Sequence, residues 1–249
     1  MFDIIPINAA TFRLTRTAQM GTHLSSENPG EISELPSIVW LLKSEDGRNI
    51  LVDAGPSSNV QRDCVFHGYV SRNEDQQLKT ALQKHGVAIN NIDLIILTHL
   101  HWDHCLGIED IPNAKVIVQR KELQYAISPI QLEMGSFDLT DRSQPPLFLR
   151  CHHRFQVVDG YYKLEEGLEL IPLPGHSPGS QGILVTTPQG KYLIAGDLVD
   201  SFRNLELSAP TGVYTSLKDF EESLVKAHNL GAKILPSHDY SVFDMFHVR

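Results

Sequence analysis

Short apolar runs separated by turn-forming residues characterise the first hundred positions of the chain. Residues 37–42 and 49–55 are two such runs, and the polar stretch 45–48 between them contains Gly47. Strands that are buried on both faces have nearly continuous apolar runs of this length, and polar residues with glycine mark the turns between them. The pattern predicts a β-hairpin over residues 37–55.

An amphipathic helix and a central strand are expected next. Between residues 73 and 85, Leu78, Ala81 and Leu82 recur at helical spacing, and Gly86 stands where a helix commonly ends. Residues 92–98 then form a β-branched apolar run that is typical of a central strand. His99 follows this run directly, so the first candidate for chemistry lies at a strand end.

The alternation of strands and helices continues in the second half of the chain. A helix is expected over residues 216–229, where Ser216 and Asp219 have the spacing of a capping box. Elements that alternate in this way predict an α/β fold with sheets packed together and helices outside. The apolar runs predict strands over residues 114–118, 167–173, 182–186, 191–195 and 232–236.

The chain is interpreted as one domain spanning residues 1–249, because no repeat or low-complexity tract marks a linker. Between about residues 125 and 150 the regular pattern dissolves into Ser-Pro, Gly-Ser and Pro-Pro pairs. This stretch is longer and more apolar than a simple loop between two elements usually is. It is interpreted either as a flap over a site or as a pair of helices packed on the core.

Composition and charge favour a globular protein that acts on small molecules. Apolar residues make up 41% of the chain and charged residues 20%, which is ordinary for a globular protein. The formal net charge of −9 gives no general attraction to nucleic acid or to an anionic membrane, so neither partner is expected. The first residues lack a secretory signal pattern and no apolar run reaches membrane-spanning length, which predicts a cytoplasmic protein.

The cysteines and histidines point to different roles. Cys64, Cys105 and Cys151 are too few and too scattered for a disulfide framework or a four-thiolate zinc site, so they are interpreted as buried free thiols. The chain has 12 histidines, and imidazole is the commonest nitrogen ligand for transition metals. Their positions therefore matter more than the cysteines.

Four candidate metal ligands fall within one tight turn after the strand predicted over residues 92–98. Alternate residues of an extended segment point the same way, so His99 and His101 share one side. Asp103 and His104, past the turn, can face a second point nearby. A catalytic site for a first-row divalent ion typically has about three nitrogen or oxygen ligands from the protein and one open position. The cluster therefore predicts two metal positions that other segments complete.

Three residues elsewhere are placed to complete these positions. His176, Asp197 and His238 each follow a predicted strand, and a carboxylate such as Asp197 can bridge two cations. Gly175 and Pro178 set a sharp turn that aims His176 back over the sheet. A single histidine at such a place is usually an ordinary hydrogen-bonded residue. The complete set in this order indicates a metal centre.

These motifs resemble those of the metallo-β-lactamase superfamily over nearly the whole chain. The resemblance implies an αββα sandwich of two mixed β-sheets with helices on the outer faces, and a site at one edge of the sheets. The family's H-x-H-x-D-H signature falls on His99, His101, Asp103 and His104. Its later ligands fall on His176, Asp197 and His238, and its Asp-x-Gly motif falls on Asp53, Ala54 and Gly55.

The resemblance also implies how the ligands are shared. One metal would be held by His99, His101 and His176, and the second by Asp103, His104 and His238. Asp197 would bridge the two ions, Asp53 would support the ligands from behind, and Asp103 and Asp197 would be the catalytic carboxylates. Two such ions would turn a bridging water into an attacking hydroxide. Zinc is the expected metal, although manganese, iron and cobalt accept the same ligands.

Within the superfamily, residues 98–104 and 174–179 and the chain length resemble the N-acyl homoserine lactonase branch. The resemblance implies a hydrolase that opens a lactone or a related ester of a small molecule. That branch has a tyrosine three residues after the bridging aspartate, where this chain has Asp200. Phe137, Asp200 and Tyr214 are the candidates for the substrate pocket.

Other functions share this pattern of ligands. A glyoxalase-II-like thioesterase uses all seven, although this chain shows no separate basic C-terminal helical domain of the kind that binds glutathione. An iron-dependent oxidoreductase like the sulfur dioxygenases uses the same scaffold, and a metal-binding protein without catalysis also fits. The sequence leaves the oligomeric state open, with a homodimer among the options.

Overall fold

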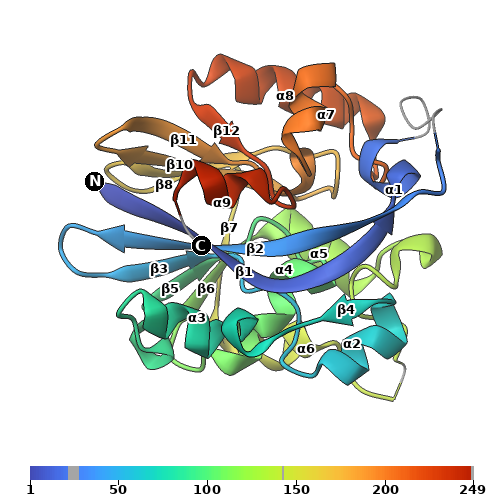
Figure 1. Ribbon diagram of the computed structural model, residues 1–249, viewed down its shortest axis with the longest axis horizontal. Helices are drawn as coiled ribbons and strands as arrows, with labels where there is room; N and C mark the ends of the chain where they lie inside the picture. The colour runs from blue at the N-terminus through green and yellow to red at the C-terminus, as the bar shows by residue number, and fades with distance from the viewer. Residues whose placement is uncertain (22–27, 142, 248–249) are drawn as a thin grey trace.

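The computed structural model describes residues 1–21, 28–141 and 143–247. Within these residues the strands form two mixed sheets, and helices cover the outer side of each (Figure 1). The larger sheet has the strand order β4-β1-β2-β3-β5-β6-β7, and the smaller one has the order β12-β11-β10-β9-β8.

The larger sheet is antiparallel from β4 to β3 and parallel from β3 to β7. In the smaller sheet only the β11 and β12 pair is parallel among the described strands. The larger sheet contains β1 (Phe2–Thr15), β2 (Ile32–Ser44), β3 (Asn49–Val52), β4 (Val70–Ser71), β5 (Leu94–Ile96), β6 (Lys115–Gln119) and β7 (Phe155–Val158). The smaller sheet contains β8 (Tyr162–Glu165), β9 (Leu168–Pro172), β10 (Gln181–Thr187), β11 (Gly190–Ile194) and β12 (Lys233–Leu235).

Helix α3 lies outside the larger sheet and α8 outside the smaller one (Figure 1). The α-helices are α1 (Arg16–Met20), α2 (Val60–His67), α3 (Leu78–Lys84), α4 (Trp102–Cys105), α5 (Arg120–Ile127), α6 (Leu147–Arg150), α7 (Phe202–Leu207), α8 (Leu217–Asn229) and α9 (Ser241–Met245). The short 3-10 helices are η1 (Glu74–Gln76), η2 (Ile89–Asn91), η3 (Leu106–Asp110), η4 (Gln131–Glu133), η5 (His152–Arg154) and η6 (Gly196–Leu198).

Strand β2 shows why its apolar run is continuous. Successive side chains of a strand point to opposite faces. Ile38 and Trp40 pack between the two sheets, whereas Val39 and Leu41 pack in the layer that contains α3. Both faces of the larger sheet are therefore covered by apolar side chains. A third apolar layer joins Phe220 of α8 to the outer face of the smaller sheet. These layers confirm the predicted αββα sandwich.

The predicted hairpin and helices are present, with shifted ends. β2 and β3 pair antiparallel with Trp40 opposite Val52, as the two apolar runs predict. The helix expected from residue 73 begins only at Leu78, because Asn73 and Gln76 form a capping box around the 3-10 helix η1. Ser216 Oγ accepts a hydrogen bond from the Asp219 amide at 3.2 Å and caps α8 at its predicted start.

The long strand β1 is missing from the sequence prediction. It contains Pro6, and its register against β2 shifts between Asn8 and Ala10. A bulge of this kind breaks the alternation by which a strand is recognised. Proline also argues against a central strand, but β4 pairs only with Thr11 and Phe12 of β1, so Pro6 lies on a free edge among the described residues.

The interpretation of the cysteines as buried thiols is wrong for one of the three. Cys105 and Cys151 are buried, whereas Cys64 is exposed. Cys64 lies on the surface helix α2, in which only Asp63 is buried.

Among the helices of the described residues, none has the length and the apolar character that a membrane-spanning helix needs.

Candidate metal centre

The seven candidate ligands of the sequence analysis meet where strands of the two sheets end. All seven side chains are buried. They form two groups that share Asp197, and in each group the possible ligand atoms lie within 4.8 Å of one another. The first group is His99, His101, His176 and Asp197, and the second is Asp103, His104, Asp197 and His238.

The segment after β5 explains how four of these residues face two points. His101 is extended, with φ −69° and ψ 153°, and it is the cap residue from which α4 begins. His99 and His101 therefore lie on the same side, with ring centroids 4.5 Å apart. Asp103 and His104 belong to α4, so the turn of the helix directs them to the second group.

The other three ligands follow strands of the smaller sheet. His176 comes after β9, Asp197 lies in η6 after β11, and His238 comes after β12. Because β11 and β12 are parallel, their carboxyl ends lie at the same edge. The backbone keeps these ends together through the hydrogen bond from the His238 amide to the Asp200 carbonyl oxygen at 2.9 Å.

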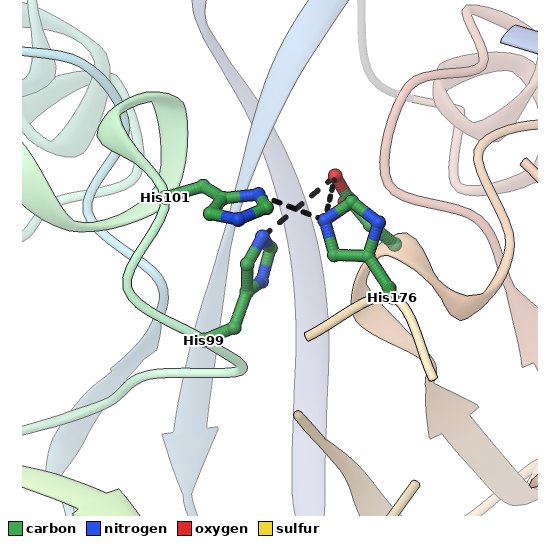
Figure 2. Close-up of side chains that lie close together, drawn as sticks. His99, His101 and His176 are labelled. Carbon is green, nitrogen blue, oxygen red and sulfur yellow. Dashed lines mark hydrogen bonds and ion pairs between the residues drawn. The ribbon is translucent and has the colours of Figure 1, made fainter. Parts of the chain in front are cut away.

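In the first group, imidazoles from two separate loops point toward one another, as Figure 2 shows. His101 Nδ1 lies 2.8 Å from His176 Nε2. Asp197 Oδ2 lies 3.4 Å from His176 Nε2 and 3.8 Å from His99 Nε2. Three nitrogens and one carboxylate oxygen therefore surround one point.

The second group gathers around the other oxygen of Asp197. Asp197 Oδ1 lies 3.0 Å from His104 Nε2 and 3.1 Å from His238 Nε2. Asp103 Oδ2 lies 3.5 Å from His104 Nε2 and 3.6 Å from His238 Nε2. Each oxygen of the Asp197 carboxylate thus faces a different group, which is the arrangement a bridging ligand requires.

In four of the histidines, the Nδ1 atom, which faces away from the cluster, has a hydrogen-bond partner within the protein. His104 Nδ1 lies 2.9 Å from Asp53 Oδ2, and Asp53 also accepts hydrogen bonds from the amide and hydroxyl of Thr98. His99 Nδ1 lies 3.0 Å from Thr98 Oγ1. His176 Nδ1 and His238 Nδ1 lie 2.8 and 2.9 Å from the carbonyl oxygens of residues 213 and 36, respectively. Such partners fix the ring orientation of metal-binding histidines and leave Nε2 directed inward.

Buried atoms without partners support a cation at each point. His99 Nε2, His104 Nε2 and Asp197 Oδ1 are buried and have no hydrogen-bond partner. His104 and Asp197 are close, but their approach is not aligned as a hydrogen bond. Unsatisfied buried polar atoms are rare because they cost free energy. Imidazole nitrogen and carboxylate oxygen are the ligands that transition metals accept, so this arrangement fits two divalent ions.

The electrostatics of the cluster depend on Asp197. Burial raises the pKa of this carboxyl, but the surrounding imidazoles of His104 and His238 outweigh burial and hold the pKa well below its usual range. Burial lowers the pKa of His238, and Asp197 outweighs it and raises that pKa to about 9. Burial and the neighbouring His104 lower the pKa of His99. The site therefore concentrates negative charge on Asp197, which favours cations around it.

The candidate pocket residues have different surroundings. Phe137 is fully buried and packs edge-on against His101, with ring centroids 4.6 Å apart. Asp200 is buried, and its Oδ1 has no hydrogen-bond partner. Tyr214 is 41% exposed. Phe137 and Asp200 therefore lie in the interior, whereas Tyr214 lies at the surface.

One neighbour of the site is absent from the sequence prediction. Phe12 of β1 packs edge-on against His238, with ring centroids 4.9 Å apart, and against Trp102 at 5.9 Å. The irregular pattern of β1 hides this strand and its residues in the sequence. Phe12 lies two residues before Leu14, and this alternation is the one local signal for it.

The sequence matches one family model and several curated relatives. The profile of the Metallo-beta-lactamase superfamily matches residues 33–238. An N-acyl homoserine lactonase from Bacillus thuringiensis is 30% identical over 198 residues, covering 75% of this chain and 73% of the relative. The N-acyl homoserine lactonase AttM from Azorhizobium caulinodans is 28% identical over 236 residues, covering 89% of this chain and 88% of the relative.

Solved structures agree on the fold. A variant of AiiA from B. thuringiensis with N-decanoyl-L-homoserine bound at its active site superposes with a TM-score of 0.79 at 24% identity, covering 97% of this chain and 95% of that one. A probable metal-dependent hydrolase from Staphylococcus aureus superposes with a TM-score of 0.81 at 18% identity, covering 96% and 89%.

Proposed function

Because the chain belongs to the metallo-beta-lactamase superfamily, we propose that it is a dinuclear metal-dependent hydrolase that opens the ring ester of a lactone. The observation that carries the proposal is the convergence of six other buried candidate ligands around the two oxygens of Asp197. The lactone is proposed because curated relatives at 28–30% identity are named N-acyl homoserine lactonases.

The proposed ligand assignment follows the two groups. His99, His101 and His176 would hold one ion, and Asp103, His104 and His238 would hold the other. Asp197 would contribute one oxygen to each. Two ions held in this way would activate a water molecule and polarise the carbonyl oxygen of the ester.

Side chains of the protein would orient the metal ligands and transfer the proton that the reaction moves. Ring opening adds water across the acyl C–O bond, so a proton has to move from the attacking water to the ring oxygen. Asp103 faces the cluster through Oδ2 alone, and we assign this transfer to it, whereas both oxygens of Asp197 would be engaged as ligands. Asp53 keeps His104 in place from outside. Trp102 and Phe12 form an apolar side of the site at His238, which limits the access of bulk water.

The test compares substrate classes on the metal-loaded protein. We expect kcat/KM for N-acyl homoserine lactones to exceed that for thioesters and phosphodiesters, and chelation to remove the activity until metal is returned. The measurement is steady-state hydrolysis beside metal analysis of the same samples. A preference for the thioester would support the glyoxalase-II-like alternative, and hydrolysis that survives complete metal removal would refute the mechanism.

We further propose that Asp200 contacts the substrate. Burial, followed by the negative charge of Asp197, raises the pKa of this carboxyl well above its usual range. These effects and the unpartnered Oδ1 place a polar group with spare hydrogen-bonding capacity beside the cluster. The resemblance to the N-acyl homoserine lactonase branch implies a tyrosine at this position, so Asp200 would serve a substrate that offers a hydrogen-bond donor near the scissile bond.

Changing Asp200 to alanine is expected to lower kcat/KM for an N-acyl homoserine lactone by about 5- to 30-fold, which corresponds to the loss of one to two kcal/mol of hydrogen bonding. A simple lactone without an amide N–H serves as the control substrate and is expected to change much less. Both rates are measured at equal metal content. Equal losses for the two substrates, or a loss of metal from the variant, would contradict a contact with the substrate.

Several further assignments stay proposals. Both interpretations of residues 125–150 stay proposals, and position 142 lies outside the described residues. The contact of Phe137 with His101 and the hydrogen bond from the Trp102 amide to the Ser136 carbonyl oxygen at 2.9 Å support a flap over the site. The burial of Phe137, Leu147 and Phe148 in the apolar core supports packing on the core. The apolar layer shared by both sheets supports a single domain over residues 1–249. Tyr214 as a pocket residue, zinc as the metal and a cytoplasmic location stay predictions, and the oligomeric state stays open.

A further inference from the structure

A buried carboxylate behind the first group joins the two loops that carry its histidines. Glu122 lies in the first turn of α5, directly after β6, and is fully buried. None of the ligand assignments above includes it. Its hydrogen bonds reach both loops, although these loops are far apart in the sequence.

One oxygen of Glu122 binds the loop of His99 and His101. Glu122 Oε1 accepts a hydrogen bond from the backbone amide of Leu100 at 2.9 Å. Leu100 stands between the two histidines, so a shift of its amide would move both imidazoles. This hydrogen bond thereby fixes the position of the loop relative to the end of β5.

The second oxygen binds the loop of His176. Glu122 Oε2 accepts hydrogen bonds from the Ser177 hydroxyl at 2.6 Å and from the Gly179 amide at 3.0 Å. The Ser177 hydroxyl is also 2.6 Å from the Ser180 hydroxyl, which in turn accepts from the Ser177 amide. The loop passes so close to α5 that a Cβ on Gly179 would lie 2.0 Å from the Glu122 amide nitrogen. The His176 loop is therefore held against the same carboxylate.

The second group is supported by other residues. His104 is held by Asp53, and His238 by the carbonyl oxygen of Pro36. The hydrogen bonds of Glu122 go to Leu100, Ser177 and Gly179, beside the histidines of the first group. Figure 2 shows that His99 and His101 approach His176 from the opposite loop, so the spacing between these two loops sets the geometry of the first group.

We propose that Glu122 is a positioning residue that sets the affinity of the His99, His101 and His176 site for its metal ion. It joins the Leu100 amide to the Ser177 and Gly179 donors and so holds the two loops at the separation that a single ion requires. Outer partners of metal ligands typically change affinity by about 10- to 100-fold. The inference rests on the dinuclear site proposed above and not on the identity of the substrate.

The test measures metal occupancy at each site separately. Glu122→Ala is expected to weaken metal binding at the first site by about 10- to 100-fold. The affinity of the second site is expected to stay close to its value in the unmodified protein. Titration with cobalt(II), followed by absorption, gives the two affinities. Anomalous scattering from crystals soaked at limiting metal assigns the remaining ion to a site. Excess metal is expected to restore occupancy.

Two further variants separate positioning from folding. Ser177→Ala removes one of the three donors, so it is expected to weaken the first site in the same direction by a smaller factor. Asp63→Asn is the matched control, because Asp63 is a buried carboxylate that accepts a hydrogen bond from Ser57 Oγ and contacts neither loop. The control is expected to bind both ions normally.

Selective loss at the first site in the Glu122 and Ser177 variants supports the proposal. Unchanged affinity at the first site in a folded Glu122→Ala protein would overturn it, and so would equal losses at both sites that Asp63→Asn reproduces. If Glu122→Ala does not fold, the Ser177→Ala titration decides in the same way. None of these readouts uses a lactone, so a protein that opens no lactone but shows the selective loss refutes only the proposed substrate.

Discussion

Replacing Asp197 by alanine is expected to lower kcat/KM for lactone hydrolysis by at least about 1,000-fold. Both oxygens of this carboxylate face the clusters, one toward His176 and the other toward His104 and His238. Its loss would remove a ligand from both of the proposed ions at once. Metal ions typically supply several kcal/mol of transition-state stabilisation, and each 1.36 kcal/mol corresponds to about a factor of ten in rate.

The same variant is expected to remain folded. Asp197 contributes to a polar cluster and not to the apolar layers that hold the sheets together. Kinetics, metal content and circular dichroism measured on one sample separate the two effects. Asp63→Asn, a substitution of a buried carboxylate away from the site, is expected to keep both ions and most of the activity. Full activity of Asp197→Ala, with or without bound metal, would refute the two-ion mechanism.

The local part of the site could be predicted because it depends on strand geometry alone. His99 and His101 alternate along an extended segment, and the start of α4 turns Asp103 and His104 toward a second point. Asp197 was predicted because a polar residue after an apolar strand emerges at a sheet edge. The parallel pairing of β11 and β12 brings it beside His238, and this pairing follows from packing that one sequence does not reveal.

The residues that were missed depend on tertiary contacts. Phe12 lies on a strand whose alternation is broken by the register shift after Asn8. Glu122 lies in a short helix with no distinguishing local pattern, and its three donors come from two distant loops. Asp200, by contrast, was a predicted pocket candidate, but its burial could not be predicted because its sequence neighbourhood is equally compatible with a surface position. Burial of a single polar side chain is a property of the assembled fold, which local periodicity does not encode.

The turn before His176 leads to the second large effect. Gly175 has φ +137°, and a Cβ at this position would lie 2.4 Å from the Cα and 2.5 Å from the amide nitrogen of Phe220 in α8. Gly175→Ala is therefore strained in its own backbone and collides with a helix backbone that a rotamer change does not relieve. Backbone strain of about 1–3 kcal/mol and overpacking of similar size add to roughly 2–6 kcal/mol.

For a chain of this length such a loss is expected to lower the melting temperature of the metal-free protein by roughly 10 °C. A second effect is specific to the site: relief of the collision displaces the loop, so His176 moves away from His101 and the first site binds its ion more weakly. Calorimetry and metal titration measure the two effects separately. Gly86→Ala is the control, because Gly86 has φ +73° but no atom lies within 4 Å of the place that an added methyl group would take, so this variant carries the backbone strain alone. Equal melting temperatures for Gly175→Ala and Gly86→Ala would show that α8 yields to the added methyl group, and the proposed link between this turn and His176 would then fail.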